Sequence, residues 1–126
     1  MADKYEVLKK YFGYTSFRKG QDELVENILQ GKDVLGVMPT GAGKSICFQV
    51  PALMMEGVTI VVSPLISLMK DQVTTLVQQG VSAAYINASL TFEQYKKVLF
   101  NTRQGKYKII YVAPERLVVD SFIEIY

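Results

Sequence analysis

One stretch of this sequence combines glycines, a lysine and a serine at the spacing that phosphate groups require. It reads Met38-Pro-Thr-Gly-Ala-Gly-Lys-Ser45. Glycines let the backbone wrap closely around an anion, because they lack a side chain and tolerate positive φ. Lys44 would place a full charge on the β and γ oxygens of a triphosphate, and the Ser45 hydroxyl can hold a magnesium ion bridging them. The stretch predicts a nucleotide phosphate loop.

This loop departs from the general pattern at one position. That pattern starts with glycine five residues before Gly43, where this chain has Met38. The alternative interpretation is a glycine-rich turn with an incidental lysine. Four features argue against this alternative: the apolar run before the loop, the predicted helix after it, the Gly-x-Gly-Lys-Ser core and the preceding Pro-Thr. Phosphate binding by residues Pro39, Thr40, Gly41, Ala42, Gly43, Lys44 and Ser45 is the favoured interpretation.

Hydrophobic periodicity outlines the elements that must position this loop. Apolar residues recur at helical spacing in 7–12 and 24–29, and each run is followed by a glycine that can end a helix. Pro51 is expected to break or restart the helix that begins at Lys44. Thr91 and Gln94 fit a capping box at the start of another helix. We predict strands at 34–38, 59–62, 83–86 and 108–112, and helices from 44, at 68–79, at 91–102 and from 118.

Strands that alternate with helices at this spacing indicate an α/β fold, a parallel sheet wrapped in helices. The 126 residues correspond to about one domain. No apolar run approaches the ~20 residues of a membrane span, so we expect no membrane partner. A single cysteine, Cys47, excludes an internal disulfide and fits a cytoplasmic setting. The net charge of +2 does not by itself indicate nucleic acid.

The segment Pro39 to Ser45 resembles the phosphate loop of superfamily-two helicases, a variant that routinely lacks the first glycine. Three further segments narrow the resemblance to the RecQ family of ATP-dependent DNA helicases. In chain order they are Phe12-Gly-Tyr14 with Phe17-Arg-Lys-Gly-Gln21, Val62-Ser-Pro-Leu-Ile-Ser-Leu-Met-Lys-Asp-Gln72, and Tyr111-Val-Ala-Pro-Glu-Arg-Leu117. Four matches in register are far more specific than any one. The resemblance implies the first RecA-like motor domain and, for the parent protein, 3′-to-5′ DNA unwinding in recombination and repair.

The resemblance also implies roles for individual residues around the nucleotide. Tyr14 would stack on adenine, Gln21 would hydrogen-bond the adenine edge, and Arg18 would support that pocket. The residue types agree with these roles, because an aromatic ring offers a stacking face and an amide offers one donor and one acceptor. From the residues alone, Tyr14 as a core aromatic and Gln21 as a helix cap are equally good interpretations. The implied cofactors are ATP and Mg²⁺, with Ser45 as the residue nearest the metal.

Two of the segments would touch single-stranded DNA or partly duplex DNA. Both follow predicted strands, so both lie at the carboxyl edge of the sheet, where open α/β sheets bind ligands. The alternative for Lys70 is an ordinary solvated helix face. The residues assigned to DNA are Ser63, Pro64, Leu65, Ser67, Lys70 and Gln72 in one segment, Pro114, Glu115 and Arg116 in the other, and Asn87 and Ser89 beside them.

Hydrolysis of ATP needs an acid that holds magnesium and positions water, and in sequence this is an apolar strand ending in Asp-Glu. Glu115 is separated from its strand by Ala113 and Pro114, so we assign it to the DNA-facing segment. We therefore expect residues 1–126 to be the front part of the motor domain, cut before a D-E-x-H box. Unpaired strand edges would then favour self-association. Two rival hypotheses stay open: a non-catalytic nucleotide or DNA binding module, and a P-loop kinase for small molecules.

Overall fold

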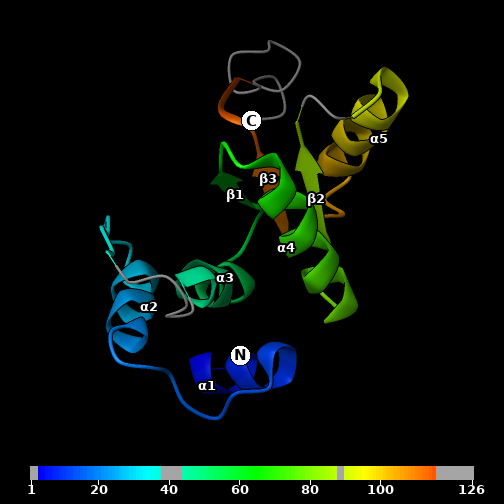
Figure 1. The fold of residues 1–126 in the computed structure, drawn as a ribbon. Coiled ribbons are helices and arrows are strands. Elements are labelled where there is room, and N and C mark those ends of the chain that lie inside the picture. The colour runs from blue at the N-terminus through cyan, green and yellow to red at the C-terminus, as the bar shows by residue number, and fades with distance from the viewer. Residues whose placement is uncertain (1–2, 38–43, 88–89, 116–126) are drawn as a thin grey trace. The chain divides into compact units, whose positions relative to one another are not determined.

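The computed structural model describes residues 3–37, 44–87 and 90–115 (Figure 1). The chain divides into two compact units, Met1–Glu56 and Gly57–Tyr126. The first unit is helical and the second contains a sheet, so each has its own core and is best considered by itself. The predicted helix from residue 118 onward lies outside the described residues.

The first unit packs its helices around a small apolar core. Its elements are α1 (Lys4–Val7), the π-helical turn η1 (Leu8–Phe12), α2 (Gln21–Leu29) and α3 (Lys44–Met54). Each of the four elements contributes one buried side chain to this core: Val7, Leu8, Val25 and Val50. The helical periodicity of 7–12 and 24–29 is thereby confirmed, because its apolar positions are the ones that meet in the core. Lys4 adds a polar link from α1 to α2, forming ion pairs with Asp22 and Glu26.

The predicted strand at 34–38 is wrong for the residues that the structure describes there. Residues 32–37 are extended but belong to no strand, and Leu35 and Val37 are 89% and 88% exposed. A parallel strand exists only through hydrogen bonds to a neighbour. The described sheet consists of β1, β3 and β2 and does not include this segment. The apolar character that suggested a strand is present, but the pairing that would make one is missing from the described part.

The predicted break at Pro51 is also wrong, because α3 continues through it to Met54. Proline removes one intrahelical hydrogen bond, and packing has to offset that loss. Pro51 is buried and is flanked by Val50 and Ala52, which are fully buried. The helix resumes its pattern beyond the proline, since the Met55 N–H donates to the Pro51 carbonyl at 3.0 Å. Tertiary packing therefore outweighs the local signal here.

The second unit is built on three parallel strands, as the sequence predicts. They are β1 (Thr59–Val62), β2 (Ala83–Ile86) and β3 (Ile109–Val112), in the order β1-β3-β2. Register aligns the last residues of all three strands, because Val62 and Ile86 both pair with Val112. All four residues of the central strand β3 are buried. A parallel strand covered on both faces reads as a continuous apolar run, and Ile-Ile-Tyr-Val fits that description.

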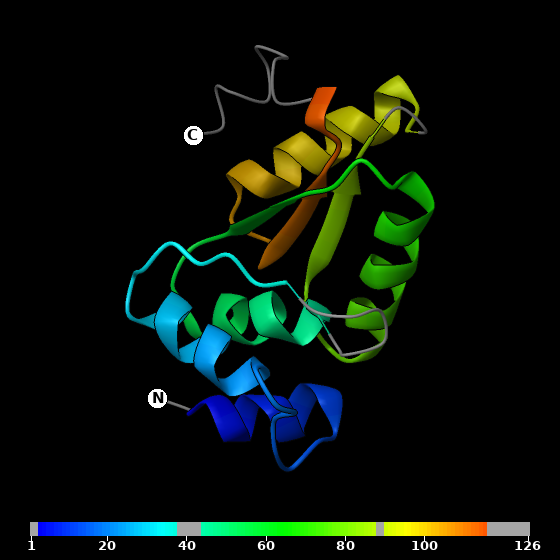
Figure 2. The same cartoon turned by 60° about the vertical axis from the view of Figure 1, so that its left-hand side comes forward.

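Two helices cover this sheet, α4 (Ile66–Gln78) and α5 (Phe92–Arg103). The crossover through α4 leads from β1 past the position of β3 to β2. The crossover through α5 leads from β2 back to its neighbour β3. Right-handed crossovers in opposite directions place their helices on opposite faces, and Figure 2 shows α4 and α5 on the two sides of the sheet. Tyr95 and Leu99 of α5 join Ile86, Ile110 and Val112 in the core of this unit.

The helices begin and end at capping motifs that can be recognised in the sequence. The Thr91 Oγ1 accepts from the Gln94 N–H at 3.2 Å, and the Gln94 Oε1 accepts from the Thr91 N–H at 2.9 Å. This reciprocal pair confirms the predicted capping box. At the carboxyl end of a different helix, α4, the Val81 N–H donates to the Leu76 carbonyl and the Gly80 N–H to the Val77 carbonyl, a Schellman motif. Gly80 adopts φ 90°, a conformation that side chains disfavour.

Candidate nucleotide and nucleic-acid sites

The phosphate loop is described from Lys44 onward. Lys44 and Ser45 are the first two residues of α3, as predicted, with Lys44 exposed and Ser45 partly exposed. Backbone N–H groups in the first turn of a helix have no intrahelical acceptor and attract anions. Lys44 therefore stands where its charge and the helix start act on the same ligand. The remaining loop residues, Pro39, Thr40, Gly41, Ala42 and Gly43, lie outside the described residues.

The three residues predicted to hold the base come together in the first unit. Tyr14, Arg18 and Gln21 line one small pocket of about 50 Å³, together with Ser16 and Ile46. Tyr14 is about half exposed, so its ring is open to a planar ligand. Ile46 comes from α3, two residues after Lys44, and it connects this pocket to the phosphate-loop helix. Sequence reasoning missed Ile46, although its place directly after the phosphate loop was a usable signal.

Gln21 is held in place by its own surroundings. It is the first residue of α2 and is buried, and its Oε1 accepts a 2.7 Å hydrogen bond from the Arg18 N–H. The preceding Gly20 has φ 88° and turns the chain into the helix. The bond fixes the side-chain amide before any ligand arrives, which is how a binding group is preorganised. Arg18 contributes to the pocket through its backbone as well as through its place in the lining.

A magnesium ion near Lys44 would have to take most of its ligands from the nucleotide. Ser45 offers one hydroxyl oxygen at the start of α3. Within residues 3–37, 44–87 and 90–115 there is no group of three or more His, Cys, Asp or Glu side chains that could hold a metal. Magnesium prefers six oxygen ligands and commonly takes them from water and substrate phosphates. Ser45 fits such an ion as one ligand among phosphate and water oxygens.

The predicted DNA-facing residues of the second unit gather at one edge of the sheet. Ser63 follows β1, Asn87 follows β2, and Ala113 leads from β3 to the exposed Pro114 and Glu115. Backbone hydrogen bonds tie these ends together, since the Ser63 N–H donates to the Val112 carbonyl and the Ala113 N–H to the Ile86 carbonyl. The parallel register thus places the three segments side by side. Ser89 and Arg116 lie outside the described part of the chain.

The start of α4 offers donors to this edge. Pro64, Leu65, Ser67 and Lys70 are all exposed, and the N-cap residue Leu65 makes no capping hydrogen bond through its side chain. The Ser63 Oγ accepts from the Leu65 N–H at 3.2 Å, which shapes the approach to the helix. Gln72 differs from these residues, because its Oε1 is buried and meets no hydrogen-bond partner among the described residues.

Asn87 occupies a different environment from the other residues assigned to DNA. It is 1% exposed, and its side-chain amide donates to the Met69 Sδ of α4 at 3.7 Å. In this structure the side chain links the end of β2 to α4 and presents no surface to a ligand. Its predicted DNA contact would require the side chain to turn outward, so a positioning role suits the geometry better.

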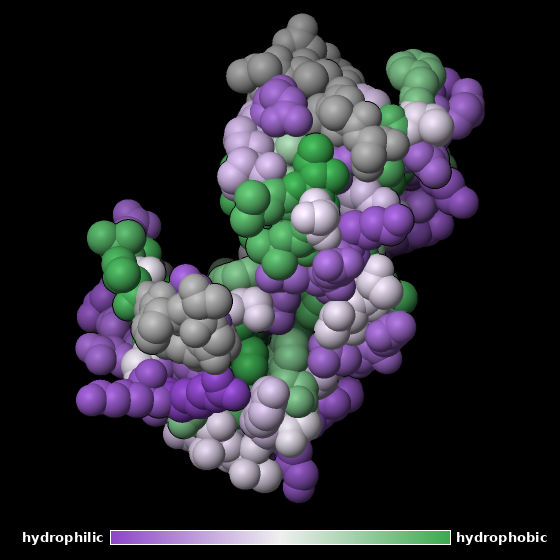
Figure 3. Space-filling model, in the orientation of Figure 1, coloured by the Kyte–Doolittle hydropathy of each residue, from purple (hydrophilic) through white to green (hydrophobic). Residues whose placement is uncertain are grey.

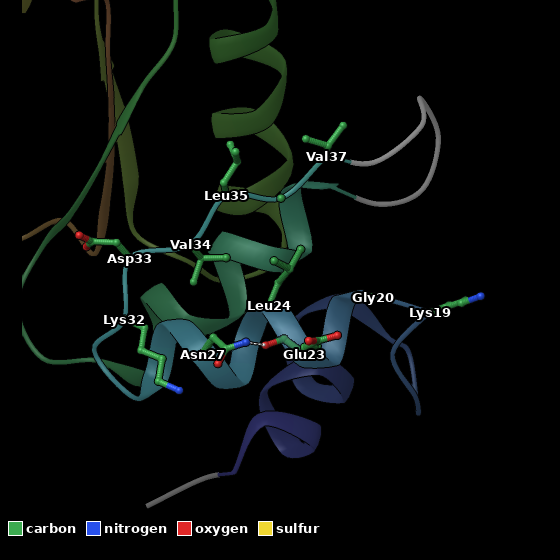
Figure 4. Close-up of a pocket in the computed structure, with 11 residues that line it drawn as sticks. Lys19, Gly20, Glu23, Leu24, Asn27, Lys32, Asp33, Val34, Leu35 and Val37 are labelled. Atoms are coloured by element: carbon green, nitrogen blue, oxygen red, sulfur yellow. Dashed lines mark hydrogen bonds between the residues drawn. The ribbon is translucent and has the colours of Figure 1, made fainter.

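A groove of about 870 Å³ runs along α2 beneath the extended segment 32–37 (Figure 4). Its apolar lining comprises Leu24, Val34, Leu35 and Val37. The side chains of Leu35 and Val37 project away from α2. Gly36 passes so close to α2 that an added Cβ would lie 2.9 Å from the Leu24 Cδ1. The segment is therefore anchored on one side and exposes apolar side chains on the other.

None of the helices among the described residues is long and apolar enough to cross a membrane.

Comparisons with known proteins identify the family to which the chain is related. The family model for DEAD/DEAH box helicases matches residues 18–124. The chain is 50% identical over 120 residues to the ATP-dependent DNA helicase RecQ of Pasteurella multocida, covering 95% of this chain and 19% of that protein. It is likewise 50% identical over 120 residues to RecQ of Bacillus subtilis, covering 94% of this chain and 20% of that protein.

A solved structure shares the fold. The crystal structure of a hypothetical ATP-dependent RNA helicase from Sulfolobus tokodaii matches with a TM-score of 0.75 at 23% identity, covering all of this chain and 38% of that one. The parallel sheet with flanking helices is thus RecA-like, as the resemblance implied. The chain spans about a fifth of the length of the RecQ proteins that it matches. By its phosphate-loop helix, its sheet and its matched residues, the chain belongs to the DEAD/DEAH box helicase family and is similar over nearly its whole length to RecQ helicases.

Proposed function

We propose that this chain is the nucleotide-binding front part of the first motor domain of an ATP-dependent DNA helicase of the RecQ type. The observation that carries the proposal is the meeting of Tyr14, Arg18 and Gln21 with Ile46 at one pocket, next to Lys44 on α3. A base against Tyr14, with its edge at Gln21, would direct its phosphates toward the start of that helix. Single-stranded DNA would lie along the edge formed by Ser63, Ser67 and Lys70.

The nucleotide site can be tested with a fluorescent ATP analogue and magnesium. We expect binding to the chain and its loss in Lys44→Ala, because the ammonium supplies the only full charge that the phosphate-loop segment 38–45 carries. Lys9→Ala is a matched control, since Lys9 is exposed on η1 and does not line the pockets at Tyr14 and Lys44. Binding that survives unchanged in Lys44→Ala would remove the basis of the proposed nucleotide site.

We further propose that residues 1–126 bind ATP and DNA but do not turn ATP over. β1, β2 and β3 run into Ser63, Asn87 and Ala113, so none of these strands places an acid directly at its carboxyl end. ATP hydrolysis should be measured with and without single-stranded DNA. No turnover in either case is expected, and the non-catalytic module is then the correct description of this chain alone. DNA-stimulated turnover that is lost in Lys44→Ala would instead make Glu115 the first candidate for the magnesium acid.

A further inference from the structure

The outer side of α5 carries exposed aromatic rings that the nucleotide and DNA sites do not use. Phe92 is 70% exposed and Phe100 is 60% exposed, whereas the other phenylalanines among the described residues are at least partly buried. The core-facing side of the same helix is already occupied by Tyr95 and Leu99. Two phenylalanines that stay in water on a helix with a complete core face indicate a surface for a partner.

Basic residues alternate with these rings along the helix. Phe92, Lys96, Phe100 and Arg103 follow one another at spacings of four, four and three residues, which places them on one side of α5. We call these four residues the aromatic–basic stripe. The Lys96 ammonium lies 5.2 Å from the centroid of the Phe92 ring. In Figure 3, an apolar protrusion over the start of α5 stands beside hydrophilic side chains.

The charge of the whole chain is concentrated around this stripe. Residues 91–106 contain four basic side chains, Lys96, Lys97, Arg103 and Lys106, and one acidic side chain, Glu93. The other 110 residues contain ten basic and eleven acidic side chains and are therefore close to neutral. The surface around the rings thus complements an anionic partner, whereas the rest of the chain has no overall preference.

We propose that the aromatic–basic stripe docks an acidic, amphipathic segment of a partner protein. Phe92 and Phe100 lie two helical turns apart, about 12 Å along the axis, which is the repeat at which a partner helix presents its apolar side chains. Carboxylates on the partner would pair with Lys96, Lys97 and Arg103 beside those contacts. A single helical stripe buries little area, so the complex belongs to the transient class of interfaces.

Nucleic acid fits the stripe less well than such a peptide. Stacking of a base needs an open aromatic face, and the Lys96 ammonium already lies over the Phe92 ring. A strand of DNA that followed α5 would also leave the sheet edge at which Ser63 and Pro114 lie. The stripe therefore acts independently of the proposed DNA path and does not extend it.

A peptide selection on the intact chain tests the proposal. We would select binders from a random phage-displayed library of peptides about 16 residues long, enough for four helical turns. The selected sequences are expected to be rich in Asp and Glu and to repeat apolar residues at spacings of three and four. Affinities of the selected peptides would then be measured by fluorescence anisotropy. Selected sequences without acidic enrichment would overturn the proposal.

Variants of the stripe locate the binding. The double variant Phe92→Ser/Phe100→Ser and the variant Lys96→Glu should each weaken the selected peptides by about tenfold or more, as central interface residues do. Val77→Ser is the matched control, because Val77 is an exposed apolar residue on α4 and should leave affinity unchanged. Circular dichroism and the unfolding midpoint show whether each variant folds like the wild type.

Two further outcomes decide between partner classes. A peptide in which lysines replace the acids should bind Lys96→Glu/Lys97→Glu better than it binds the wild type, since the charges are then exchanged. Equal binding of the selected acidic peptides to wild type and to all stripe variants would overturn the proposal. So would an oligothymidylate that binds the chain and loses affinity in Phe92→Ser/Phe100→Ser but not in Ser67→Ala, because the stripe would then be a nucleic-acid surface.

Discussion

At the scale of single residues, the surroundings of a buried polar side chain decide whether it can reach a ligand. Gln21 and Asn87 are both buried amides that the sequence assigns to ligands. Gln21 lines the same pocket as Tyr14, whereas Asn87 contacts Met69 inside the second unit. Both side chains carry an amide, so only the fold could place one of them at the candidate base pocket and the other inside the second unit.

Cys47 illustrates the same dependence on burial. It is buried on α3, and desolvation raises the pKa of its thiol above the ordinary range. A raised pKa lowers the thiolate fraction near neutral pH, and the thiolate is the reactive form. We predict that iodoacetamide labels Cys47 slowly in the folded chain at pH 8 and quickly in denaturant. Mass spectrometry over time measures both rates, and equal rates would show that the thiol is accessible.

Lys4 should stabilise the chain modestly and in a pH-dependent way. Its ion pairs with Asp22 and Glu26, mainly the hydrogen bond to Asp22, raise the pKa of its ammonium above the ordinary range. Because the folded-state pKa is the higher one, this contribution is complete below the unfolded value of 10.5 and declines as the pH rises above it. We predict that Lys4→Met lowers the free energy of unfolding by less than about 1 kcal/mol at pH 7.

Urea unfolding of Lys4→Met and of the wild type, at low and high salt, measures that difference. Lys9→Met is the matched control, since Lys9 is exposed on the adjoining turn η1. The difference for Lys4 should shrink at high salt, because both carboxylates are about half exposed and therefore screened. A loss that is independent of salt would point to packing of the lysine stem instead.

At the scale of elements, the sequence predicts what is local and misses what depends on neighbours. The capping box at Thr91 and the helix stop before Gly80 are decided within a few residues, and both are confirmed. The strand predicted at 34–38 depends on a partner strand, and the break predicted at Pro51 depends on the packing of α3. Both of those predictions fail, because hydrogen-bond partners and tertiary burial are not encoded in the local pattern.

The stop at Gly80 gives an element-scale prediction. An alanine there would have to adopt φ 90°, although the space around an added Cβ is open. The cost is therefore conformational, and we predict that Gly80→Ala lowers the free energy of unfolding by about 1 kcal/mol. Gly80→Asn should cost less, because asparagine tolerates the left-handed region better than alanine does. Thermal or urea unfolding compares the two variants, and an equal loss would indicate that space rather than φ is limiting.

At the scale of the whole molecule, the predicted chemistry divides with the fold. Tyr14, Gln21 and Lys44 belong to the helical unit, and Ser63 and Lys70 belong to the unit with the sheet. The order of the motifs along the sequence predicted the family, and the alternation of strands with helices predicted the α/β class. It could not show that the chain packs as two units, since a boundary depends on where contacts are dense and where they are sparse.

Self-association is the prediction that belongs to this scale. Leu35 and Val37 expose apolar side chains on an extended segment, a template for pairing with another chain. We propose that the chain forms concentration-dependent oligomers and that Leu35→Lys/Val37→Lys makes them dissociate. Light scattering coupled to gel filtration measures both, with Val77→Lys as the matched control. A monodisperse wild-type monomer at high concentration would rule the proposal out.

The position of β3 at the centre of the sheet also sets an order of events during synthesis. Within the described sheet, β1 and β2 do not pair with each other, and each takes its hydrogen bonds from β3. β3 comes last of the three along the chain, so the earlier strands emerge from the ribosome with no sheet to join. At about 5–20 residues per second, several seconds pass before Ile109 to Val112 are made. The helices of the first unit can pack during that interval, whereas β1 and β2 stay exposed to chaperones until β3 arrives.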